Sequence, residues 1–260
     1  MPKWAVLIWV IGTGFAVHAQ TNSAATSGSI APAASPAPAT PAVAVPTTSP
    51  DNARYLANPA LLDHCQKELS AFADKPCNLI FIGGTIVVGW RGPGKAVWDK
   101  FYVPRKAFNF SIEGDTTQNV LWRLTNLDLA SIHPKVAVIM IGQANAKNTV
   151  HEIADGIKAV EVNTQIAFPN IKIIFISIVP NAQEPDKMTQ VNSIVRSYAD
   201  NANVFFVNLV PKMPPVEKTS PDGTVTVNFK GIGPDHFLPD ATGYQIWADT
   251  MEPVLAPLLR

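Results

Sequence analysis

The sequence predicts an α/β protein, a single three-layer α/β/α domain built on a mainly parallel five-stranded sheet. The first observation is a series of short, nearly continuous apolar runs, which is typical of strands buried on both faces. The second is that these runs alternate with longer amphipathic segments typical of helices. The third is size: 260 residues, 47% of them hydrophobic, supply enough apolar material for one substantial core.

Each predicted strand is an apolar, β-rich run. The five strands are expected at residues 78–82, 107–112, 136–141, 172–178 and 203–209. Because parallel neighbours need long crossover connections, helices are expected between them. These helices are expected at residues 53–71, 94–101, 116–127, 150–168, 186–200 and 242–259. The third helix has Asp115 or Thr116 as its N-cap, since both residue types accept hydrogen bonds from the first free N–H groups.

The N-terminal segment resembles an export signal rather than part of the domain. Lys3 precedes an apolar run over residues 4–17, and the pattern Val17-His18-Ala19 fits a cleavage site. Residues 1–19 are therefore expected to be a signal peptide, which leads to a periplasmic or extracellular location. The alternative, an uncleaved membrane anchor, requires about 20 apolar residues, and this run is shorter. Residues 20–52 are rich in Ala, Pro, Ser and Thr and are expected to be a linker, with the domain at 53–260.

Composition excludes several classes of function. Twenty basic and twenty acidic residues cancel, so no overall field favours nucleic acid or an anionic membrane. The five histidines are scattered and no metal-ligand spacing occurs, so neither a metal nor a cofactor is expected. The two cysteines, Cys65 and Cys77, fit either a disulfide in an exported protein or two free thiols.

In doubly wound sheets, ligands bind at the loops that follow the carboxyl ends of the strands. In chain order, those loops and the segment before the last helix read "IGGTIVVGW", "NFSIEGDTTQNVLWRL", "IGQANAKNT" and "PDHFLPDATGYQIWA". With these motifs the chain from residue 78 to residue 258 resembles the SGNH (GDSL) hydrolases, which have a flavodoxin-like fold. Within them it is most similar to the platelet-activating-factor acetylhydrolase branch.

The resemblance implies positions for a nucleophile and a base. The family's first block is Gly-Asp-Ser, with serine as the nucleophile, and here it reads Gly83-Gly84-Thr85. The family's last block is Asp-x-x-His, in which aspartate orients the general base. Here Asp235 occupies the acid position, whereas Leu238 occupies the base position. A leucine side chain cannot accept a proton, so the base that a hydroxyl nucleophile requires is absent.

The resemblance also implies an oxyanion hole, made by the nucleophile's own N–H, a glycine N–H and an asparagine side chain. Gly114 matches the glycine, but Ala144 stands where the asparagine belongs. Gly84, Asn145 and His236 are further cleft candidates. His236 as a shifted base would require the loop to be remodelled, and Asn145 as a shifted donor competes with an ordinary loop role.

These substitutions predict an exported, catalytically impaired relative that keeps a cleft for a small-molecule ester or a glycan. One alternative is an active esterase that uses Thr85 or another base. Another is a structural or partner-binding module. The sequence leaves the oligomeric state open, and no membrane span is expected after signal cleavage.

Overall fold

The computed structural model describes residues 58–260, apart from residues 74, 180–184, 220–221 and 223. The predicted signal peptide and linker lie outside the described residues, and so does the start of the first predicted helix at 53–57. No helix in the described part of the chain is long and apolar enough to cross a membrane.

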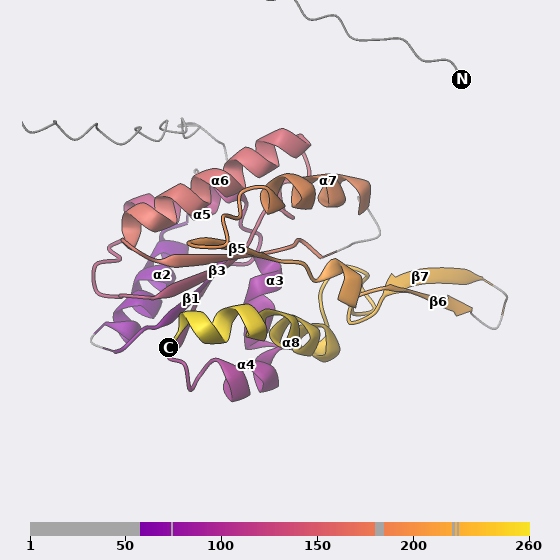
Figure 1. The fold of residues 1–260 in the computed structure, drawn as a ribbon, viewed down its shortest axis with the longest axis horizontal. Helices are drawn as coiled ribbons and strands as arrows, with labels where there is room; N and C mark the ends of the chain where they lie inside the picture. Colours follow the sequence, from indigo (N-terminus) through magenta and orange to yellow (C-terminus); the bar gives the residue numbers. More distant parts are fainter. Residues whose placement is uncertain (1–57, 74, 180–184, 220–221, 223) are drawn as a thin grey trace, which may run out of the picture. The chain divides into compact units, whose positions relative to one another are not determined.

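The predicted apolar runs form one sheet, in which all the strands are parallel (Figure 1). Within the described residues this sheet has five strands in the order β2-β1-β3-β4-β5, which is the flavodoxin-like order. The strands are β1 Leu79–Gly83, β2 Ala107–Ser111, β3 Val136–Met140, β4 Lys172–Ile176 and β5 Val204–Val207. The predicted fold class is therefore confirmed, and each predicted strand is displaced by at most two residues at either end.

The predicted helices also form. They are α2 Pro59–Phe72, α4 Lys95–Phe101, α5 Thr117–Asn126, α6 Val150–Ala167, α7 Pro185–Arg196 and α8 Ala241–Leu258. The sequence analysis did not predict the short helices α3 Thr85–Val88, η1 Gly89–Arg91 and η2 Val210–Lys212. Helix α6 has a capping box, in which the Thr149 side chain accepts from the Glu152 N–H and the Glu152 carboxylate accepts from the Thr149 N–H.

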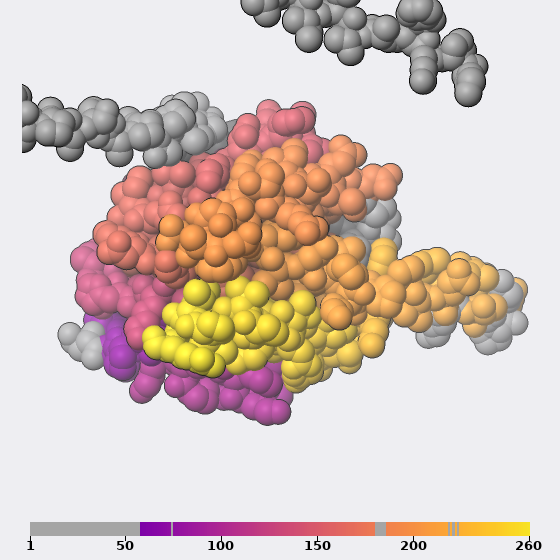
Figure 2. All heavy atoms as spheres, viewed as in Figure 1, coloured from indigo at the N-terminus to yellow at the C-terminus, as the bar shows by residue number. Residues whose placement is uncertain are grey.

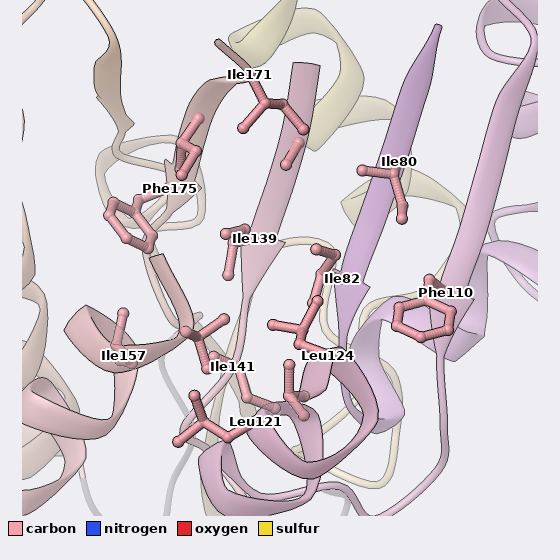
Figure 3. Close-up of a cluster of buried hydrophobic side chains, with 14 of the residues drawn as sticks. Ile80, Ile82, Phe110, Leu121, Leu124, Ile139, Ile141, Ile157, Ile171 and Phe175 are labelled. Carbon is pink, nitrogen blue, oxygen red and sulfur yellow. The ribbon is translucent and has the colours of Figure 1, made fainter. Parts of the chain in front are cut away.

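The two faces of the sheet bury different side chains because successive residues of a strand point to opposite faces. In β1, Ile80 and Ile82 pack with α5 and α6, whereas Leu79 and Phe81 pack with α4 and α8. Figure 3 shows strand side chains of the first cluster pointing toward Leu121 and Leu124 of α5 and Ile157 of α6. Both faces are thus closed by helices, and only the strand ends and edges are left for ligands.

A two-stranded antiparallel hairpin follows η2 and extends away from the sheet and its helices (Figures 1 and 2). Its strands are β6 Pro215–Thr219 and β7 Val225–Phe229. Val216, Val225 and Val227 are exposed on it, whereas Phe229 packs against the cluster around α8. The sequence analysis did not predict this hairpin.

Cys65 and Cys77 are both buried free thiols in this structure, which corresponds to the second of the two states that fitted the sequence. Burial raises the pKa of the Cys77 thiol to about 11, and burial likewise raises the pKa of the Cys65 thiol. Because the thiolate is the reactive form, both side chains are expected to be chemically inert at neutral pH.

Candidate functional site

The loops at the carboxyl ends of the strands meet around a small cleft. It lies where the sequence analysis expected ligands to bind, and the volume it encloses is about 30 Å³. Its lining residues are Gly84, Thr85, Ile86, Asp115, Met140, Ile141, Gly142, Gln143, Ala144, Ile178 and Phe237. The cleft therefore includes the predicted nucleophile position and one of the two predicted oxyanion positions.

The turn after β1 is tightly packed. A Cβ atom on Gly83 would lie 2.3 Å from the carbonyl oxygen of Met140, so only glycine fits there. Gly84 precedes α3 as its N-cap, and Thr85 is the first residue of that helix. The Thr85 Oγ1 atom accepts a hydrogen bond of 2.8 Å from the backbone N–H of Gly114. The structure thus brings the predicted nucleophile position and the predicted oxyanion glycine into direct contact.

The loop after β2 lies directly against Gly84. A Cβ atom on Gly84 would lie 2.8 Å from the backbone oxygen of Asp115, closer than such contacts normally come. Gly114 has a φ of +74°, a conformation that favours glycine. An aspartate at position 84, as in the family's first block, would therefore displace this loop.

Asp115 does not cap α5. The N-cap is Thr116, the other predicted candidate, which forms a capping box with Asn119. Instead, the Asp115 carboxylate accepts hydrogen bonds from Nε and Nη2 of Arg123, at 3.0 and 2.8 Å, and both side chains are fully buried. This ion pair was not predicted from the sequence. Asp115 lies just before α5 and Arg123 lies on that helix, eight residues later.

Gly142 is the second residue after β3, and its φ of +113° is a conformation that favours glycine. Ala144 lines the cleft but offers only a methyl group. The Asn145 amide faces the start of α5: its Oδ1 accepts from the Thr117 N–H at 3.0 Å and its Nδ2 donates to Gln118 Oε1 at 2.8 Å. The structure therefore gives Asn145 the loop role, not that of a shifted oxyanion donor.

Gln143 is a cleft residue that the sequence analysis did not single out. It lines the cleft, and its Oε1 and Nε2 atoms are both buried without a hydrogen-bond partner in the described part of the chain. Its position two residues after the predicted third strand at 136–141 was the available signal, but glutamine has no role in the family motifs.

The segment before α8 presents a different side chain to the cleft from the one that the motif predicts. Oδ1 of Asp235 accepts from the backbone N–H groups of Phe237 and Leu238, both at 3.0 Å. Leu238 packs against the apolar cluster around α8, and Phe237 lines the cleft. His236 adopts a left-handed conformation with φ +57°. Among the described residues, no hydrogen bond joins Thr85 to Asp235 or His236.

Among the described residues, no group of three or more His, Cys, Asp or Glu side chains could hold a metal ion. The lining residues of the cleft are mostly apolar, with the Thr85 hydroxyl beside them, whereas the polar atoms of Gln143 and the side chain of Asp115 are buried. Such a lining can orient a small neutral group.

Comparisons with known proteins identify relatives. The chain is 34% identical over 150 residues to the platelet-activating factor acetylhydrolase IB subunit alpha2 of Homo sapiens, a match that covers 58% of this chain and 62% of the relative. The chain thus spans less than two thirds of that relative's length.

Two solved structures share the fold. One is a candidate acylhydrolase from Bacteroides fragilis, with a TM-score of 0.60, 18% identity and coverage of 77% of this chain and 97% of the other. The other, from Streptococcus pneumonia and named for platelet activating factor, has a TM-score of 0.56 and 19% identity over 80% of this chain and all of the other.

The family model described as GDSL-like lipase/acylhydrolase matches residues 96–251, which is more than half of the chain. The match begins after the Gly83-Gly84-Thr85 turn and includes the loops after β2 and β3 and the segment before α8. This protein belongs to the GDSL-like lipase/acylhydrolase family.

Proposed function

We propose that this protein is an exported member of the GDSL family that has lost ester hydrolysis and uses its cleft to bind a small acyl compound or glycan. Its relatives are named as acetylhydrolases and acylhydrolases. We therefore compare the cleft with the groups that ester hydrolysis requires. The proposal of export rests on residues 1–19 of the sequence alone.

The observation that carries the proposal is the side chain at the base position. Leu238 packs into the apolar cluster around α8, and its neighbour Phe237 lines the cleft. Neither side chain can take a proton from a hydroxyl group. A threonine hydroxyl without a base is a poor nucleophile at neutral pH.

The oxyanion positions support the same conclusion. The Gly114 N–H, which the family uses to stabilise the oxyanion, donates to the Thr85 hydroxyl oxygen. Ala144 supplies no donor. Loss of one donor costs about 2.7–4 kcal/mol of transition-state stabilisation in enzymes where it has been measured. Loss of a triad member costs about a million-fold in kcat in the best-studied case.

A turnover assay with p-nitrophenyl acetate tests the loss of catalysis. The purified protein is expected to hydrolyse the ester at the uncatalysed rate, and Thr85→Ala is expected to leave that rate unchanged. Turnover that Thr85→Ala abolishes would show an active esterase and would refute the proposal.

Variants that restore the family's residues provide a positive control for the assay. The triple variant Thr85→Ser, Ala144→Asn, Leu238→His restores the family's nucleophile, donor and base. It is expected to exceed the matched double variant Thr85→Ser, Ala144→Asn, which still lacks a base, by about a hundredfold. Position 84 stays glycine because a larger side chain would displace the Asp115 loop.

A further inference from the structure

The β6–β7 hairpin is a two-stranded sheet, so each of its strands has one edge that pairs with no other strand of the described chain. It extends away from the main sheet (Figures 1 and 2), and a two-stranded ribbon surrounded by water is only marginally stable. Strand β6 contains residues that discourage pairing at its free edge, namely Pro215, Glu217 and Lys218. Strand β7, with the sequence Val-Thr-Val-Asn-Phe, has neither a proline nor a charge. The free edge of β7 is therefore open to a further strand.

The backbone hydrogen bonds of the hairpin show which groups of β7 point to that free edge. The Lys230 N–H donates to the Pro214 carbonyl at 2.9 Å, so residues 230 and 214 form a hydrogen-bonded pair. Hydrogen-bonded and non-hydrogen-bonded pairs alternate along an antiparallel ladder, so the even-numbered residues of β7 bond to β6. The outward N–H and C=O groups are consequently those of the odd-numbered residues Val225, Val227 and Phe229.

The outward groups of Phe229 are already bonded within the chain. Its N–H donates to Asn228 Oδ1 at 2.8 Å, and its carbonyl accepts from the Ile232 N–H at 3.0 Å. Among the described residues, no hydrogen bond of this kind involves Val225 or Val227, whose fractional exposures are 56% and 47%. The free edge thus offers two donors and two acceptors, which come from two alternate residues.

These four groups match a second copy of the same strand. When two β7 strands run antiparallel about a twofold axis at Thr226, Val225 of one copy lies opposite Val227 of the other. This register forms four hydrogen bonds and uses every free group, whereas an axis at Val227 would require the groups of Phe229 that are already bonded. Val225 and Val227 lie on one face of β7, so their side chains also pack across the junction.

Charge complementarity supports the same register. Asp222 and Lys230 each lie four residues from Thr226, so this axis places Lys230 of one copy opposite Asp222 of the other. Both side chains are exposed, and neither forms an ion pair with another described residue. Asp222 is held in its turn because its Oδ1 accepts from the Thr224 N–H at 3.0 Å. The twofold axis therefore gives two lysine–aspartate pairs, one at each end of the junction.

We propose that this protein forms a twofold-symmetric dimer in which the β7 strands of two copies pair antiparallel and make a continuous four-stranded ribbon. The two β6 strands form the outer edges of the ribbon, where Pro215 and the charged residues discourage further pairing, so the assembly closes at two copies. A junction of two short strands is small beside stable protein interfaces, so the dimer is expected to dissociate on dilution. The hairpin contributes no residue to the cleft, so the dimer is independent of the proposed binding function.

Sedimentation velocity over a series of protein concentrations tests the dimer and its register. The wild-type protein is expected to shift from monomer to dimer as its concentration rises. Lys230→Glu and Asp222→Lys each place like charges opposite one another twice, and each is expected to weaken dimerisation about fivefold or more. An equimolar mixture of these two variants is expected to form a mixed dimer, because opposite charges then face each other at both ends.

Val227→Pro tests the strand edge itself. Proline has no N–H group, and the N–H of residue 227 points away from β6, so the substitution keeps the hairpin bonds while each copy loses one donor at the junction. It is expected to weaken dimerisation about tenfold or more. Glu217→Pro is the matched control, since it removes the outward N–H at the facing position of β6, and it is expected to leave dimerisation unchanged. Thermal unfolding shows whether each variant folds, and the charge variants provide the test if a proline variant does not.

Three results would overturn the proposal. One is a wild-type protein that stays monomeric at every concentration. Another is a dimer that neither Val227→Pro nor the charge reversals weaken, which would place the interface elsewhere. The third is a mixture of Lys230→Glu and Asp222→Lys that associates no better than either variant alone, which would contradict the register with Thr226 on the axis.

Discussion

The Asp115–Arg123 ion pair supports the cleft from behind. The Arg123 guanidinium donates to Asp115 and to the backbone oxygen of Phe110, and it lies 4.2 Å from the centre of the Phe110 ring. Both charged groups are fully buried, so each depends on the other for its stability. Asp115 is one of the lining residues of the cleft although its side chain is buried, so the pair holds that part of the wall in position.

Arg123→Met is expected to lower the free energy of unfolding by about 3–5 kcal/mol, because it leaves the Asp115 carboxylate buried without a counter-ion. The double variant Arg123→Met, Asp115→Asn is expected to be more stable than Arg123→Met alone. Urea unfolding provides the measurement, and Arg196→Met, at an exposed position of α7, is the control expected to change stability by less than about 0.5 kcal/mol. A double variant no more stable than the single one would contradict this account.

The start of α5 connects two of the family's loops. Thr116 caps the helix with Asn119, and Asn145 from the loop after β3 accepts a hydrogen bond from the N–H of Thr117. The Asn145 side chain therefore links the loop after β3 to the N-terminus of α5, which follows the loop after β2. Asn145 thus acts on the cleft by positioning these loops.

Asn145→Ala is expected to lower the free energy of unfolding by about 1–3 kcal/mol, because the buried Thr117 N–H loses its acceptor. Chemical denaturation of Asn145→Ala and of Asn126→Ala, an exposed asparagine near the end of the same helix, measures the difference. Equal stability of the two variants would show that Asn145 is not needed for the cap.

The β6–β7 hairpin shows why one element escaped prediction. Nearly continuous apolar runs, which predicted the five strands of the main sheet, are typical of strands covered on both faces. Residues 225–229 alternate apolar and polar side chains instead, and the Asp-Gly pair at 222–223 is a common hairpin signal. The signal was present in the sequence, but it belongs to a ribbon outside the main sheet.

The described chain is organised around one sheet with an apolar cluster on each face. Among the described residues, the side chains of these clusters come from residue 61 onward. The expected division of the chain into a signal at 1–19, a linker at 20–52 and a domain at 53–260 stays a prediction, because the first two segments lie outside the described residues.

Expression of the full sequence in a bacterial host tests that organisation. The exported protein is expected to begin at Gln20, and intact-mass spectrometry will show the loss of residues 1–19. Ala19→Arg, which places a large charged residue at the cleavage site, is expected to block processing. Recovery of uncleaved wild-type protein from the cytosol would refute the export proposal.

The sequence determined the strands, their approximate ends and the identity of each side chain at the family's positions, since hydrophobic periodicity and residue chemistry are local properties. Its resemblance to the family led to the prediction that Thr85, Ala144 and Leu238 occupy those positions. The tertiary structure decided the partnerships: the Gly114 N–H with Thr85, Asp115 with Arg123, and Asn145 with α5. It also buried both polar atoms of the Gln143 side chain without a hydrogen-bond partner among the described residues. Most of these contacts join residues far apart in the chain, so they depend on how strands align and loops fold, which local patterns do not encode.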